Sequence, residues 1–82
     1  MIEQLYDIIQ DVYKTMNKEF TIPLSEISGE SKLQDLGIDS LTFVMIMMQI
    51  ESKFQVRLAP EGITSFKTVN DVIQTISNAK NN

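Results

Sequence analysis

The sequence contains no cysteine and no histidine among its 82 residues. Without cysteine the chain can form no disulfide and offers no thiol as a nucleophile or metal ligand. Without histidine it lacks the commonest general base and the commonest metal ligand of proteins. The acidic residues that remain are scattered and predict no oxygen cage for a cation. We therefore expect a protein that is not an enzyme and that has neither catalytic residues nor a metal site.

Positive charge and long apolar runs are also scarce. Seven Lys and Arg residues stand against eleven Asp and Glu residues, so the net charge is −4. Nucleic-acid binding requires a basic surface and is therefore not expected, whereas basic patches on partner proteins would attract this chain. No apolar run is long enough for a membrane span, and the Met1 end lacks the pattern of a signal peptide. These absences predict a cytoplasmic monomer that does not insert into membranes.

The chain length suits one small domain, which we expect to span residues 1–82. Apolar residues spaced by three and four predict an amphipathic helix over Ile2–Met16. A second apolar stripe predicts a helix over Leu41–Phe54, with a cap at Asp39 or Ser40.

A third main helix is predicted after Thr68, which forms a variant capping box with Asp71. Pro60 suits the first turn of a short helix that runs through Ile63. The fold class is thus all-α, a small four-helix bundle with three main helices and one short helix.

A long loop, Asn17–Leu36, separates the first two helices. Proline, glycine and serine interrupt any helical period there, apart from one turn expected near Leu24–Ile27 or Lys32–Leu36. Apolar residues recur along the loop, so we expect it to be pinned over the bundle. A loop of this length in a compact domain usually indicates a function.

The most informative segment is Asp-Leu-Gly-Ile-Asp-Ser-Leu at residues 35–41. By itself, an Asp-Ser pair before a helix is usually only a cap. A serine at the start of a helix, after a turn that contains Gly37, is nevertheless exposed. The amino end of the helix favours negative charge, so a phosphodiester on Ser40 would be stabilised there.

This segment, followed by a helix that closes on Glu51 and Phe54, resembles the Asp-Leu-Gly-x-Asp-Ser-Leu signature of the acyl carrier proteins. The order of helices resembles that family over essentially the whole chain. The resemblance implies that a phosphopantetheinyl transferase attaches a 4′-phosphopantetheine arm from coenzyme A to Ser40. Asp39, Gly37 and Leu41 would surround the attachment point. The arm would carry acyl groups as thioesters between ligases, acyltransferases or ketosynthases in fatty-acid, specialised lipid or polyketide synthesis.

The resemblance also implies a partner-binding surface on the second helix, which in fatty-acid carriers is rich in acids. Here Thr42 and Met45 stand where the family commonly has acids, whereas Val44 and Met48 match its apolar contact positions. We therefore expect a surface that is less acidic and more apolar than usual, and a narrower set of partners. Its expected members are Asp35, Leu41, Val44, Met45, Met48 and Glu51.

Two alternatives stay open. The first is an aminoacyl or peptidyl carrier of a nonribosomal pathway, although an acid before Ser40 favours the acyl class. The second is a helical adaptor that is never modified and binds a partner through Val44, Met45 and Met48. A failure of every transferase to modify Ser40 would identify the adaptor.

Overall fold

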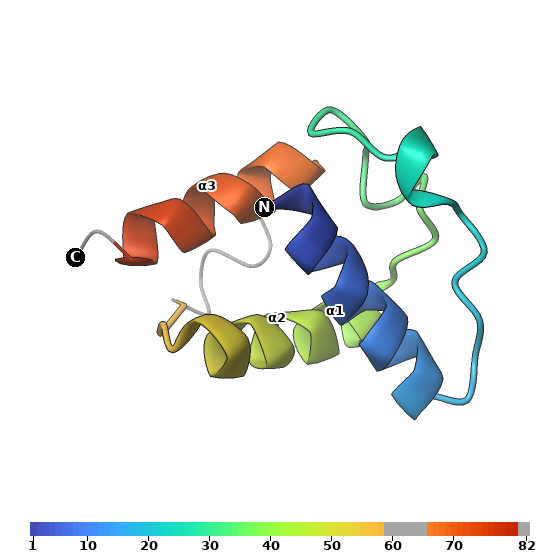
Figure 1. Cartoon of the computed structure of the whole chain (residues 1–82), viewed down its shortest axis with the longest axis horizontal. Coiled ribbons are helices and arrows are strands. Elements are labelled where there is room, and N and C mark those ends of the chain that lie inside the picture. Colours follow the sequence, from blue (N-terminus) through green and yellow to red (C-terminus); the bar gives the residue numbers. More distant parts are fainter. Residues whose placement is uncertain (59–65, 81–82) are drawn as a thin grey trace.

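The computed structural model describes residues 1–58 and 66–80 (Figure 1). Within these ranges there are three α-helices, α1 (Ile2–Thr15), α2 (Ser40–Phe54) and α3 (Val69–Lys80). There is also one 3-10 turn, η1 (Leu24–Glu26), and the described part of the chain contains no strand. The all-α class and the three main helices are therefore confirmed. The short helix expected over 60–63 lies outside the described residues.

The helices enclose an apolar core. In Figure 1, α1 crosses in front of α2, and α3 lies above α2. Each helix buries the side chains that lie three and four positions apart, because these share one face of a helix. The buried members on the three helices are Leu5, Ile8, Ile9, Val12, Phe43, Ile46, Met47, Ile50, Val69, Val72 and Ile76. Within the described ranges, no helix has both the length and the apolar character required to cross a membrane.

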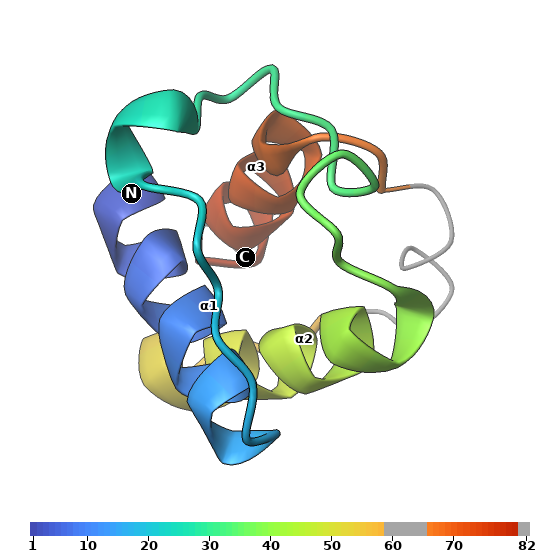
Figure 2. The ribbon, with the colours of Figure 1, turned by 90° about the vertical axis from the view of Figure 1, so that its right-hand side faces the viewer.

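The loop between α1 and α2 returns along α1 and then passes the amino end of α3 (Figure 2). Backbone hydrogen bonds join it to α3: Leu33 N–H donates to Lys67 O at 2.9 Å, and Asn70 N–H donates to Gly29 O at 2.8 Å. The loop also buries four apolar side chains, Phe20, Leu33, Leu36 and Ile38. The expected pinning over the bundle is therefore confirmed, and so is the helical turn near Leu24.

The amino end of α3 has the predicted capping box. Thr68 Oγ1 accepts a hydrogen bond from Asp71 N–H at 3.3 Å, and Asp71 Oδ2 accepts one from Thr68 N–H at 3.0 Å. A second N–H, from Lys67, donates to the same carboxylate oxygen at 2.8 Å. These backbone donors hold the pKa of Asp71 below its usual range. The cap fixes the start of α3, where the loop is attached.

Candidate functional site

Ser40 is the first residue of α2, and its side chain is exposed. The residue before it, Asp39, has extended backbone angles and is the N-cap, because its Oδ1 accepts the Thr42 N–H at 2.8 Å. The structure thus resolves the choice between Asp39 and Ser40 as the cap in favour of Asp39. The backbone N–H of Thr42 holds the pKa of the Asp39 carboxyl below its usual range. The Ser40 hydroxyl is not needed as the cap of this helix.

The turn before Ser40 depends on Gly37, whose φ is +78°. An added Cβ at Gly37 would meet nothing within 4 Å, so its backbone conformation, not crowding, favours glycine here. The turn is closed by Ile38 N–H, which donates to Leu33 O at 3.1 Å. The Ile38 side chain is buried in the core. The chain therefore enters α2 from an anchored position, with Asp39 and Ser40 directed outward.

The carboxyl end of α1 lies against this turn. The Tyr13 hydroxyl donates to Gly37 O at 3.3 Å, and the Thr42 hydroxyl donates to Met16 Sδ at 3.8 Å. Burial raises the pKa of Tyr13, and the negative charge of nearby Asp39 raises it further. Tyr13 was not among the site residues expected from the sequence, and this contact was not expected either. The only local indication of this contact was the residue type: Tyr13 is an aromatic residue with a polar hydroxyl in the last turn of a helix.

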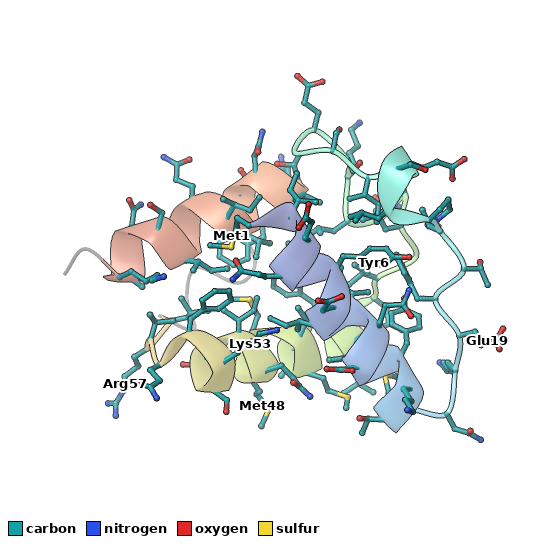
Figure 3. All side chains as sticks on the ribbon, viewed as in Figure 1. Met1, Tyr6, Glu19, Met48, Lys53 and Arg57 are labelled. Carbon is teal, nitrogen blue, oxygen red and sulfur yellow. The ribbon has the colours of Figure 1, made fainter. Side chains whose placement is uncertain are left out.

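The surface of α2 next to Ser40 is apolar. Leu41 is 66% exposed, Val44 is 42% exposed and Met48 is 63% exposed. Figure 3 shows Met48 extending from α2 away from the other two helices. These three residues, called the apolar face below, lie on the exposed side of α2 as the sequence predicted.

The other expected members of the partner surface differ in their environments. Asp35 is exposed, whereas Met45 is half-buried and packs against the core. Glu51 is also half-buried, and its Oε2 accepts the Leu58 N–H at 3.0 Å. Thr42, which the sequence analysis compared with surface acids of the family, is only 3% exposed and lies outside this surface.

An open cavity of about 620 Å³ lies beside Ser40. Phe43 and Val44 of α2, Ile38 of the preceding turn and Phe66 contribute apolar side chains to its wall. The rings of Phe43 and Phe66 meet edge to face, with centroids 5.5 Å apart. Lysines 32 and 67 also line the cavity. A linear group attached to Ser40 would find an apolar wall here, and a phosphate on the serine would lie at the amino end of a helix.

Few groups suited to catalysis lie among the described residues of the site. Among the described residues that line the cavity, Asp39 is the one carboxylate, and it is occupied as a cap with a lowered pKa. Such a carboxylate is a poor base at neutral pH. Residues 1–58 and 66–80 contain no group of three or more His, Cys, Asp or Glu side chains that could hold a metal ion. The arrangement can present a serine hydroxyl to another protein and can accommodate what is attached to it.

Comparisons with known proteins identify one family over most of the chain. The family described as "Phosphopantetheine attachment site" matches residues 3–76. The acyl carrier protein of Rickettsia bellii is 37% identical over 81 residues, which cover 98% of this chain and 94% of the relative. The acyl carrier protein of Kineococcus radiotolerans is 33% identical over 75 residues, covering 90% of this chain and 93% of the relative. The crystal structure of the acyl carrier protein from Thermotoga maritima matches this structure with a TM-score of 0.74, over 96% of this chain and 88% of that one. The two sequences are 20% identical, so this likeness shows the fold alone.

Proposed function

This chain belongs to the acyl carrier proteins, the family with a phosphopantetheine attachment site, and on that premise we propose that Ser40 is the residue that carries the arm. The protein is a carrier and not an enzyme, and its cofactor is covalent 4′-phosphopantetheine. One observation supports Ser40 most strongly: it is exposed at the first position of α2, whose cap is supplied by Asp39.

The attachment step requires a hydroxyl that a second protein can reach. Ser40 Oγ forms a bond to the phosphorus of the phosphate that bears the pantetheine, and the pyrophosphate bond of coenzyme A breaks. Adenosine 3′,5′-bisphosphate leaves, and the hydroxyl proton passes to a base of the transferase. We assign that base to the transferase because this chain has no histidine and Asp39 is occupied as the cap.

Once attached, the phosphodiester would be favoured by the free N–H groups and the dipole at the amino end of α2. The cavity wall formed by Ile38, Phe43, Val44 and Phe66 would shelter the apolar part of the arm or its cargo. When bound, phosphopantetheine supplies the thiol that holds an acyl group as a thioester. This chain has no cysteine and therefore no thiol of its own. The chain itself positions the arm and presents it.

Membership of the family implies interaction with acyl-processing enzymes. We propose that these partners dock on the apolar face, with Met45 beside it and Asp35 and Glu51 at its edges. The candidates are the ligases, acyltransferases or ketosynthases of fatty-acid, specialised lipid or polyketide synthesis. The transferase is a further partner, which has to reach Ser40 itself. We further propose that residues 1–82 act as a single domain, as a monomer, in the cytoplasm, where coenzyme A is available to the transferase.

Intact mass after incubation with coenzyme A, Mg²⁺ and a broad-specificity phosphopantetheinyl transferase tests the role of Ser40. The parent should gain one phosphopantetheinyl group, and Ser40→Ala should gain none. Ser52→Ala removes an exposed hydroxyl from the same helix and should load like the parent. Since Asp39 provides the cap, Ser40→Ala should change the free energy of unfolding by only about 0.5 kcal/mol.

Loading of the Ser40→Ala variant would place the attachment site elsewhere. No loading of a folded, initially unmodified parent would contradict the carrier function and favour the adaptor.

A further inference from the structure

Two hydrogen bonds and one charge interaction link the region where α1 ends to the region where α2 begins. Tyr13 donates to Gly37 O at 3.3 Å, and Met16 Sδ accepts the Thr42 hydroxyl at 3.8 Å. Lys18 lies close enough to Asp39 for its positive charge to lower the pKa of that carboxyl. Gly37 and Thr42, which flank Ser40, are therefore held against the end of α1, although they are more than twenty positions away in sequence.

The ring of Tyr13 is held in place by aromatic packing. Its centroid is 5.1 Å from that of Phe20, and Phe20 in turn lies 5.9 Å from Tyr6 in an edge-on arrangement. Phe20 is buried, so the three rings tie the start of the long loop to α1. A ring fixed in this way limits the positions that its hydroxyl can occupy, and the one observed places it on the Gly37 carbonyl.

Gly37 is the point at which the approach to α2 has most freedom. Glycine has the largest range of backbone conformations, and Gly37 is exposed. Its own N–H donates to Gln34 O at 3.0 Å, while its carbonyl receives the Tyr13 hydroxyl. The Gly37 carbonyl belongs to the peptide that leads into Ile38 and Asp39, so a restraint on it also restrains the direction of Ser40.

We propose that Tyr13 is a positioning residue for attachment of the arm: its hydroxyl holds the Gly37 carbonyl and thereby orients Ser40 for the transferase. This inference rests on the proposed role of Ser40. Transfer to a hydroxyl depends strongly on its orientation toward the reacting phosphorus, so small displacements of the acceptor lower the rate. The raised pKa of Tyr13 keeps its hydroxyl protonated, and therefore a donor, throughout the neutral range.

The test compares Tyr13→Phe with Tyr6→Phe. Both variants lose one phenolic hydroxyl from α1 and keep their ring, and the Tyr6 hydroxyl bonds to Ile22 O at 2.8 Å, in the part of the loop away from Ser40. Figure 3 shows Tyr6 on the side of α1 that faces this loop. Steady-state loading by the transferase should show a kcat for Tyr13→Phe about two- to tenfold below the parent, the range expected for one lost hydrogen bond. Its KM for the carrier should not change, and Tyr6→Phe should load like the parent.

Amide exchange measured by NMR supplies a readout that does not depend on the transferase. In Tyr13→Phe the amides of Ile38, Asp39 and Ser40 should exchange faster, whereas Tyr6→Phe should leave them unchanged. Equal kcat values for the parent and Tyr13→Phe would overturn the inference and leave the carrier function intact. A loss confined to KM would also overturn it, because it would mean that Tyr13 contacts the transferase directly. Loading of Ser40→Ala would instead contradict the proposed function itself.

Discussion

Helix α2 has apolar side chains on two faces, and the fold covers only one of them. On the core face, Ile46 is 2% exposed and Ile50 is completely buried. On the apolar face, Leu41 and Met48 are each more than 60% exposed. Because exposed apolar groups are common on monomers only when they are scattered, three on one side of a helix beside Ser40 support the docking surface that we propose. Hydrophobicity alone therefore does not distinguish the residues that hold this fold together from those available to another molecule.

Two residues at the boundary between the two faces show that polarity does not predict burial either. Thr42 is polar yet only 3% exposed, because its hydroxyl turns inward to Met16, the residue that follows α1. Met45 is apolar yet half-buried, in contact with the edge of the core. Packing of α1 against α2, more than the polarity of each side chain, determines which positions of the helix remain available to a partner.

The largest effect on stability is expected on the core face. Ile50→Ala removes a completely buried side chain and should lower the free energy of unfolding by about 2–5 kcal/mol. Met48→Ala shortens an apolar side chain on the other face and should change it by only about 0.5 kcal/mol. Denaturant unfolding followed by circular dichroism measures both. Equal losses would mean that the two faces do not differ in their contribution to the fold.

An intermediate effect is expected from charge on the apolar face. Met48→Glu should spare attachment of the arm but reduce kcat/KM for an acyl-processing partner by about fivefold, the effect of losing one useful interface contact. Ser52→Glu adds the same charge at an exposed position one turn further on and serves as its control. Unchanged kinetics of Met48→Glu with every partner tested would remove the support for this docking surface.

The smallest effect on stability is expected from a fall in pH. It protonates the carboxylates that cap the helix ends and changes no side chain on either apolar face of α2. The pKa values of Asp39 and Asp71 are lowered in the folded protein by backbone N–H donors. Their stabilising contribution is thus complete above the ordinary aspartate pKa of about 3.9 and is lost as the pH falls through the lowered values. Thermal melts should show the midpoint temperature falling with pH in that range.

Asp39→Asn provides the control for the acid series. Asparagine also caps helices, so the variant should melt near the parent temperature at neutral pH. Its midpoint should decrease less than that of the parent on acidification, because one of the two carboxylates is missing. An identical pH dependence would assign the effect to groups other than the α2 cap.

Local features of this protein were predictable from the sequence. The helices over Ile2–Thr15 and Ser40–Phe54 begin and end within one residue of the predicted bounds, and the Thr68–Asp71 cap formed as expected. Helical periodicity and capping depend on groups within four residues of one another, so a single sequence contains the required information. The exposed Ser40 at a helix start is a local feature of the same kind.

Tertiary structure decided the features that join distant residues. The contact of Tyr13 with Gly37 spans 24 positions, and the loop is joined to α3 through Gly29 and Asn70. Nothing near Thr42 in the sequence predicts its burial, since that depends on where α1 ends. A sequence specifies which face of a helix is apolar, but the covering of that face depends on the placement of the other helices. For α2, that placement left one apolar face exposed beside Ser40.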